Sequence, residues 1–173
     1  MNAAANKKSS KNDLFDLEHL AKTLSFDEQN TLPADEKYIV FLTSQDFYAV
    51  ATKQITEIIR PIDVAPLPNV PAWISGIANL RGEIIPVIDL QKLFSKKDSG
   101  VPKSKFIVLR PENSLASIAF AVDALSEIVT VSDAEINLAT DELSPCVYGT
   151  TVYKSNVLRF IDVKNLLTSL SIN

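Results

Sequence analysis

The residue types that most often perform catalysis or bind metals are scarce in this chain of 173 residues. The single histidine, His19, and the single cysteine, Cys146, lie far apart in the sequence, so neither has a second histidine or cysteine for a metal site or a thiolate pair. The sequence also contains no glycine-rich phosphate-binding loop. It therefore predicts a protein that is not an enzyme and has no cofactor or metal, with Cys146 as a small buried thiol.

Two aspartates could in principle act as acid–base groups. Asp89 and Asp162 each follow an apolar, strand-like run and precede a short segment with helical spacing. A carboxylate at that position accepts hydrogen bonds from the free N–H groups of a first helical turn. We therefore expect both aspartates to cap helices.

The most distinctive stretch is 73–94, in which Gly76 and Gly82 enclose five residues that include Arg81. Gly82 favours a tight turn because glycine adopts positive φ without steric cost. The apolar residues that follow, Ile84, Ile85, Val87, Ile88 and Leu90, predict a buried strand. Pro86 cannot donate to a ladder, so we expect this strand at a sheet edge or with a bulge. The simplest interpretation is a buried hairpin with a solvated arginine at its tip.

Composition limits the function classes. Hydrophobic residues make up 46% and charged residues 22%, as in soluble globular proteins. The net charge of −4 argues against nucleic-acid binding through a basic face. No apolar stretch approaches the roughly 20 residues of a membrane span, and the N-terminus does not have the pattern of a secretory signal. These features predict a cytoplasmic protein.

The chain divides into an N-terminal extension at 1–36 and a domain at 37–173. Within the extension, the spacing of Leu14, Leu17, Ala21 and Leu24 predicts an amphipathic helix at about 13–24, between a polar start and a linker. A helix this short is marginal alone in water. It is expected to dock either on its own domain or in a partner's groove.

The domain is predicted to be mainly β. Strands are expected at 38–42, 47–50, 56–60, on both sides of Gly82, and at 105–109, 117–122, 127–131, 147–152 and 156–161. Helical segments are expected at 91–94 and 163–170. A Pro-rich, extended path joins residues 61 and 71.

An internal repeat relates the two halves of this domain. An offset of 73 residues pairs Gly76 with Gly149, Arg81 with Lys154, Asp89 with Asp162 and Leu93 with Leu166, and an offset of 70 pairs residues 55–58 with 125–128. The repeat predicts two related β-lobes, each of about five short strands, that share a core. Arg81-Gly82 is replaced by Lys154-Ser155 in the second half. Symmetry does not require that difference, so the first turn is expected to have a task of its own.

The segment Gly76-Ile-Ala-Asn79-Leu-Arg81-Gly82, continued by Glu-Ile-Ile-Pro-Val-Ile-Asp-Leu, resembles the CheW family of chemotaxis coupling proteins over about 37–170. The resemblance implies two intertwined five-stranded SH3-like β-barrel lobes with short helices and a C-terminal helix. It also implies an adaptor between the cytoplasmic tip of a methyl-accepting chemoreceptor and a CheA-type histidine kinase, recruited to membrane receptor arrays. The kinase carries a related domain, so the two would pair lobe to lobe.

The resemblance further implies that Glu57 and Arg81 lie close together at the receptor-coupling surface. The protein-binding residues expected from it are Ile55, Glu57, Gly76, Asn79, Arg81, Gly82 and Lys105. An alternative is that the Glu57–Arg81 pair only fastens the hairpin to the third strand. An exposed pair of this kind contributes about 0–1 kcal/mol, and losing one member of a buried pair costs about 3–5 kcal/mol.

Three functional alternatives stay open. Trp73 and the extension resemble the PilI-type branch, which serves type IV pilus twitching. A stand-alone SH3-like module would bind unrelated ligands and would need an aromatic-lined groove. An adaptor that competes for receptors would uncouple them from the kinase while using the same surfaces.

Overall fold

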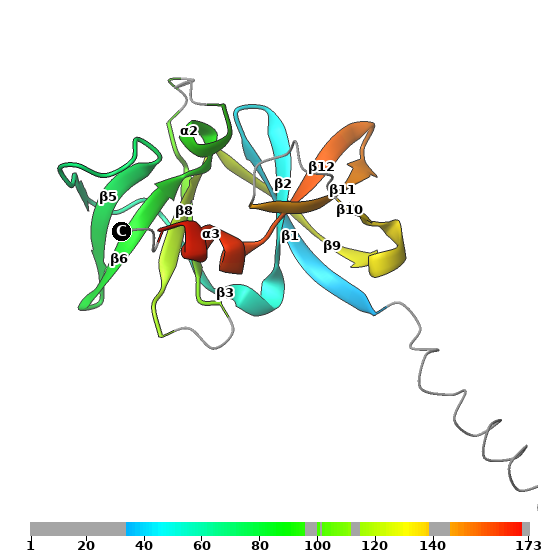
Figure 1. Cartoon of the computed structure of the whole chain (residues 1–173), viewed down its shortest axis with the longest axis horizontal. Helices are drawn as coiled ribbons and strands as arrows, with labels where there is room; N and C mark the ends of the chain where they lie inside the picture. Colours follow the sequence, from blue (N-terminus) through cyan, green and yellow to red (C-terminus); the bar gives the residue numbers. More distant parts are fainter. Residues whose placement is uncertain (1–33, 96–99, 101, 112–114, 139–145, 171–173) are drawn as a thin grey trace, which may run out of the picture. The chain divides into compact units, whose positions relative to one another are not determined.

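The computed structural model describes residues 34–95, 100, 102–111, 115–138 and 146–170 (Figure 1). The strands and helices below all belong to the compact unit Asp35–Asn173. The predicted helix at 13–24, with His19, lies outside the described residues. No helix within the described ranges is long and apolar enough to cross a membrane.

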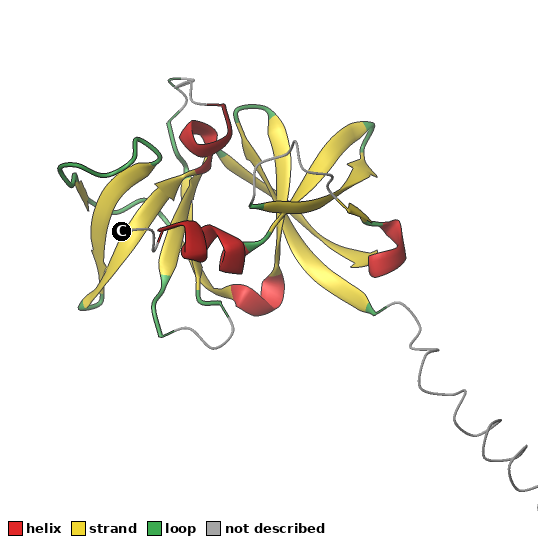
Figure 2. Ribbon diagram, in the orientation of Figure 1, coloured by secondary structure: helices red, strands yellow, loops and turns green. Residues whose placement is uncertain are grey.

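The described part of the domain is mainly β, as predicted (Figure 2). Its strands are β1 (Asp35–Thr43), β2 (Asp46–Ala51), β3 (Ile55–Ile59), β4 (Val64–Ala65), β5 (Ile74–Leu80), β6 (Glu83–Asp89), β7 (Lys105–Leu109), β8 (Ile118–Val122), β9 (Ala124–Ser132), β10 (Asn137–Leu138), β11 (Val147–Tyr153) and β12 (Asn156–Ile161). The helices are α2 (Leu90–Ser95) and α3 (Val163–Leu170), with 3₁₀-helices η2 (Thr52–Gln54) and η3 (Asp133–Glu135). The sequence did not predict β4 and β10, because two residues are too few to show an alternating pattern.

The twelve strands form two six-stranded sheets with the same internal order. Sheet 1 runs β4-β5-β6-β8-β7-β3 and sheet 2 runs β10-β11-β12-β2-β1-β9. Each sheet therefore takes four strands from one half of the chain and two from the other. The halves meet at two parallel pairings, β6 with β8 and β12 with β2, and at two antiparallel pairings, β3 with β7 and β1 with β9. This exchange confirms the expected intertwined lobes, and β4 and β10 bring each sheet from five strands to six.

The repeat is visible in backbone detail. β5 and β11 are offset by 73 residues, and both ladders shift register at the equivalent place, between Ile74 and Gly76 and between Val147 and Gly149. Gly76 has a φ of 143°, and a Cβ there would collide with the backbone of Ala65. This backbone position requires glycine.

Pro86 lies neither in an edge strand nor at a bulge, so the expectation of one or the other was wrong. It belongs to β6, which runs between β5 and β8. The ladder between β6 and β8 begins at Val87, one residue after Pro86. The missing N–H group of the proline therefore falls outside that ladder. The bulge of this hairpin is in β5, between Ile74 and Gly76, and not at Pro86.

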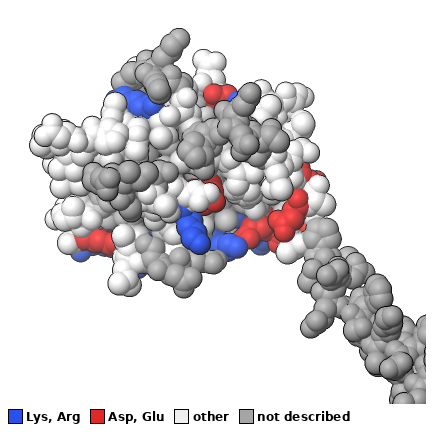
Figure 3. Space-filling view, in the orientation of Figure 1, with Lys and Arg blue, Asp and Glu red and all other residues white. Residues whose placement is uncertain are grey.

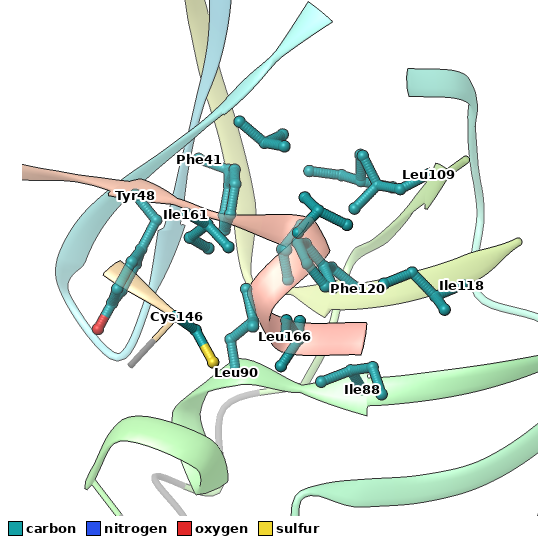
Figure 4. Close-up of a cluster of buried hydrophobic side chains, with 14 of the residues drawn as sticks. Phe41, Tyr48, Ile88, Leu90, Leu109, Ile118, Phe120, Cys146, Ile161 and Leu166 are labelled. Carbon is teal, nitrogen blue, oxygen red and sulfur yellow. The ribbon is translucent and has the colours of Figure 1, made fainter. Parts of the chain in front are cut away.

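The two lobes share a hydrophobic core, as the repeat predicted, and each sheet also has a smaller cluster of its own. The largest cluster joins Phe41 of sheet 2 to Ile88 and Phe120 of sheet 1, with Leu166 of α3 packed among them (Figure 4). Cys146 belongs to this cluster and is only 2% exposed. Its burial confirms the expectation of a buried thiol.

Both aspartates cap helices, as predicted. Asp89 Oδ1 accepts hydrogen bonds from the backbone N–H groups of Gln91 and Lys92, at 3.0 and 3.3 Å. Asp162 Oδ1 accepts one from Asn165 N at 2.9 Å. These bonds satisfy N–H groups of the first turns of α2 and α3.

A largely buried polar network also connects the lobes. Lys103 Nζ donates to Asp123 Oδ1 at 2.8 Å and to Gln91 Oε1 at 3.1 Å, and it lies 3.6 Å from Asp89 Oδ1. Asp123 Oδ2 accepts a hydrogen bond from Ser44 N in the β1–β2 turn. The network thus ties a turn of sheet 2 to the start of α2, at the end of sheet 1.

Candidate functional site

The β5–β6 hairpin closes with a two-residue turn at Arg81 and Gly82. Their φ values are 53° and 93°, so both central residues have the positive φ of a type I′ turn. Asn79 Oδ1 accepts a hydrogen bond from Gly82 N at 2.8 Å. The structure confirms the predicted turn at Gly82 and gives Asn79 a local role in holding it. We call residues Asn79–Ile84 the β5–β6 tip.

Arg81 and Glu57 form a two-bond ion pair between this tip and strand β3. Arg81 Nη1 donates to Glu57 Oε1 at 3.2 Å, and Nη2 donates to Oε2 at 2.9 Å. The Arg81 side chain is 77% exposed and that of Glu57 27% exposed. The expected proximity is confirmed. A pair this exposed contributes about 0–1 kcal/mol to stability. Because the Arg81 side chain is 77% exposed, most of its surface is available to a partner.

A second ion pair lies at the same tip. Arg110 Nη2 is 3.1 Å from Glu83 Oε2, and Arg110 also donates to Ser117 Oγ at 2.9 and 3.2 Å. A hydrogen bond from Ser117, together with the nearby charge of Arg110, lowers the pKa of the Glu83 carboxyl. Beside these charges, Ile84 is 57% exposed. The tip therefore presents both charged and apolar side chains.

The equivalent β11–β12 tip, residues Val152–Val157, has its own ion pair. Lys154 Nζ lies 2.6 Å from Glu127 on β9, and Tyr153 also donates its hydroxyl to Glu127. Hydrogen bonds from Lys154 and Tyr153 lower the pKa of the Glu127 carboxyl. Acid–base pairing is therefore common to both halves. The expectation that the first turn is special cannot rest on the pairing alone.

The two tips differ in their exposed side chains. Val152 and Val157 face each other across the β11–β12 ladder and are 80% and 49% exposed. The equivalent cross-strand pair of the first tip is Asn79 and Ile84. The second tip thus presents two aliphatic side chains where the first presents one amide and one aliphatic group.

Four of the seven expected binding residues come together at the β5–β6 tip, namely Glu57, Asn79, Arg81 and Gly82. The other three do not. Ile55 is partly buried and packs against the shared core. Gly76 is buried at the bulge in β5. Lys105 begins β7, three residues before Val108, the register partner of Glu57.

Sequence reasoning missed several residues at the two tips. The repeat already held the signal for the second ion pair, since its offsets place Glu57 on Glu127 and Arg81 on Lys154. Arg110 and Ser117 gave no such signal. They flank the connection between β7 and β8. The pairing of these two strands brings Arg110 to Ser117, and the pairing of β8 with β6 brings both towards Glu83.

Charge is mixed on the face of the molecule that Figure 3 shows. On the face drawn in Figure 3, basic and acidic side chains lie beside one another and form no face of a single sign. In the described residues, no cluster of three or more His, Cys, Asp or Glu side chains is arranged to hold a metal ion. The arrangement at both tips is suited to binding another protein surface, through exposed ion pairs beside aliphatic groups.

Comparisons with known proteins agree over most of the chain. The family model of the CheW-like domain matches residues 37–171. Chemotaxis protein CheW of Helicobacter pylori is 27% identical over 159 residues, which cover 90% of this chain and 94% of that protein. Chemotaxis protein CheW of Treponema pallidum is 26% identical over 146 residues, covering 78% of this chain and 85% of that protein.

A solved structure extends the agreement to the fold. The scaffolding protein TtCheW from Thermoanaerobacter tengcongensis superimposes with a TM-score of 0.66 and 26% sequence identity, over 79% of this chain and 90% of that protein. The family match includes both sheets and both hairpin tips. The chain therefore belongs to the CheW-like family, which its Asn-Leu-Arg-Gly motif already resembled.

Proposed function

We propose that this protein is a non-enzymatic adaptor that couples the cytoplasmic tip of a methyl-accepting chemoreceptor to a CheA-type histidine kinase, at membrane receptor arrays. The observation that carries the proposal is the family match over 37–171, which includes both lobes and so both candidate binding surfaces. The naming of a related structure as a scaffolding protein supports a role without catalysis.

The receptor is assigned to the β5–β6 tip. Arg81 is 77% exposed and uses both terminal nitrogens on Glu57, so its planar fork is held in a fixed direction. A guanidinium held in this way can share its remaining N–H groups with carboxylate or carbonyl oxygens of a partner. An exposed pair also adds little to stability. These properties support a surface that recognises a partner.

The kinase is assigned to the β11–β12 tip, through contact of lobe with lobe. The opposed pair of Val152 and Val157 leaves aliphatic surface in water. Covering such surface gains about 25 cal/mol per Å². Glu127 and Lys154 already neutralise one another beside it. This arrangement supports an interface dominated by apolar contact.

Reconstitution tests the proposal directly. The chain is mixed with a receptor cytoplasmic fragment and a CheA-type kinase, and kinase autophosphorylation is followed as a function of chain concentration. We expect receptor-dependent activation that rises with the chain. An adaptor that only lowers kinase activity would be a competitor. If the chain binds neither protein in a pull-down, the coupling role is contradicted. The stand-alone SH3-like module would then be the remaining alternative.

The SH3-like module finds little support in the described residues. A peptide groove of that kind needs exposed aromatic rings, but the large exposed hydrophobic side chains here are all Ile, Leu or Val. Trp73, which suggested the pilus branch, is partly buried against the shared core and so has a packing role. Deleting the gene separates the pathways, because loss of swimming chemotaxis and loss of twitching are scored independently.

A further inference from the structure

The β5–β6 tip extends beyond the strands that support its hairpin. On one side, β4 pairs with β5 only at Ala78 and Ile77. On the other side, β8 pairs with β6 only from Val87 onward. The described ladders therefore pair Asn79–Ile84 only within the hairpin. The direction in which the tip points must depend on side-chain contacts.

Two ion pairs of opposite polarity provide such contacts. The tip offers a cation, Arg81, to Glu57 on β3, and an anion, Glu83, to Arg110 immediately after β7. Strands β3 and β7 are neighbours in sheet 1. Both pairs thus connect the tip to the same two strands, which we call the β3–β7 platform. The two pairs cannot exchange partners, because an exchange would place Arg81 against Arg110 and Glu83 against Glu57.

Arg110 is itself held firmly on that platform. Its backbone N–H donates to the carbonyl of Gln54 at 2.8 Å, just before β3 begins. Its guanidinium donates to the hydroxyl of Ser117, a residue that is only 3% exposed. The side chain of Arg110 is 45% exposed, so one edge is fixed by Ser117 while the other meets Glu83.

The second hairpin shows that this contact is not part of the repeat. Asn156 occupies the position equivalent to Glu83, and its side chain donates to the carbonyl of Lys154, within its own turn, at 2.9 Å. At the second tip, the hydroxyl of Tyr153 provides the additional contact to β9, on the same Glu127 that binds Lys154. The link from Glu83 to Arg110 is therefore a property of the first tip.

We infer that Arg110 is a positioning residue of the coupling surface: with Glu83 and Ser117 it fixes the β5–β6 tip, so that Arg81 stays on Glu57 in the orientation that meets a receptor. The inference rests on the proposed function for its consequence, but the geometry can be tested without any partner. Arg110 acts through Arg81, and it does not itself contact the receptor.

The first measurement follows the tip alone, in the full chain. The ¹⁵N relaxation order parameter of Arg81 Nε is compared in the wild type, Arg110→Gln and the control Arg159→Gln, which breaks the Arg159–Asp46 pair in the other sheet. We expect the order parameter to fall in Arg110→Gln only. It should be restored by the charge exchange Glu83→Arg with Arg110→Glu. An Arg81 side chain that is equally ordered in Arg110→Gln and the wild type would overturn the inference.

The second measurement is receptor-dependent activation of a CheA-type kinase. Arg110→Gln should weaken coupling about threefold to tenfold, and the charge exchange should restore it. Arg110→Gln added to Arg81→Ala should cause no further loss, because the two residues act in one chain of contacts. An additive loss, or a charge exchange that restores order but not coupling, would mean that Arg110 touches the partner and is not a positioning residue. If Arg81→Ala leaves coupling intact, the assigned receptor surface fails, while the order parameter still decides the role of Arg110.

Discussion

The two hairpin tips share a backbone but differ in their chemistry. Both have a register shift before a buried glycine, a two-residue turn with positive φ at both positions, and an ion pair to β3 or β9. The backbone hydrogen bond at the base of each hairpin is also equivalent: Asp89 N donates to Trp73 O, and Asp162 N donates to Cys146 O. Apart from the φ of the bulge glycine, which is positive at Gly76 and not at Gly149, the differences described here lie in side chains that face solvent or a neighbouring strand.

Those differences follow a pattern. The first tip has charged groups in two bridges, with Glu83 and Arg110 added to the common pair. The second has a phenol, Tyr153, and the exposed pair of Val152 and Val157. The comparison teaches that the repeat preserves what the backbone requires, while each tip carries its own surface for binding. Four predictions test this division, in decreasing order of expected effect.

The largest effect should come from the bulge glycine of the first hairpin. Gly76→Ala places a Cβ against the backbone of Ala65, at a φ of 143° that L-residues rarely adopt. We expect a loss of about 2–4 kcal/mol of unfolding free energy. At Gly149 the added Cβ would meet the Ile136 side chain and, at 3.1 Å, the carbonyl oxygen of Asn137, but φ there is not positive, so Gly149→Ala should cost about half as much. Urea melts of both variants measure the difference, and equal losses would contradict it.

The next effect concerns coupling and not stability. Arg81→Ala should reduce receptor-dependent kinase activation about tenfold while changing the unfolding free energy by less than about 1 kcal/mol. Lys154→Ala, its counterpart, should lower activation much less, because that turn lacks the Asn-Leu-Arg-Gly sequence, and as a change to an exposed ion pair it should also alter the unfolding free energy by less than about 1 kcal/mol. Kinase assays and urea melts on both variants form a matched set. Equal effects on coupling would remove the functional distinction between the tips, and a loss of several kcal/mol for Arg81→Ala would make it a scaffold residue.

Much of the fold was predictable because it depends on local periodicity. The bounds of β7, β12 and α3 match the expected 105–109, 156–161 and 163–170. The repeat predicted a shared core, and residues such as Phe41 and Phe120 now lie together in it. The parallel pairings β6–β8 and β12–β2 could not be derived from local pattern. They join residues more than 30 positions apart, and a strand's alternation does not specify which neighbour it will choose.

The candidate site was predictable in part for the same reason. Arg81 and Gly82 belong to a local turn, and their geometry follows from the motif. The approach of Arg110 to Glu83 depends on how strands β6, β7 and β8 order themselves, which one sequence does not reveal. Pro86 was misplaced because the missing N–H group was taken to need a sheet edge or a bulge, when it only needs a position outside the β6–β8 ladder.

A smaller effect should distinguish the second tip as an apolar surface. Val152→Ser removes aliphatic surface from a side chain that is 80% exposed, so stability should change little. We expect binding of a CheA-type kinase to weaken about threefold. Moderate salt should leave the wild-type complex nearly unchanged, since salt screens exposed charges and not apolar contacts. The matched control is Asn79→Ser at the equivalent position. A steep fall of affinity with salt, or the same weakening in the control, would contradict the assignment.

The smallest effect is a dependence of stability on pH that both tips should share. The pKa of Glu127 is lowered by hydrogen bonds from Lys154 and Tyr153, and that of Glu83 by Ser117 and Arg110. A carboxyl whose pKa is lower in the folded state binds fewer protons there than in the unfolded chain. Its stabilising contribution is therefore present above the usual glutamate value of 4.5 and is lost as the pH falls through the folded pKa.

Glu127→Gln and Glu83→Gln should accordingly be less stable than the wild type at neutral pH, with a difference that shrinks below a pH of about 4.5. Urea midpoints recorded from pH 7 down to pH 3 measure it. Tyr153→Phe keeps the ring that packs edge-on against Phe47 but removes the hydroxyl donor, so it should show part of the Glu127→Gln effect. If the stability difference between each variant and the wild type stays constant over this pH range, these hydrogen bonds do not lower the pKa of the carboxyl groups. A difference at one tip only would mean that the two hairpins hold their carboxylates in physically different ways.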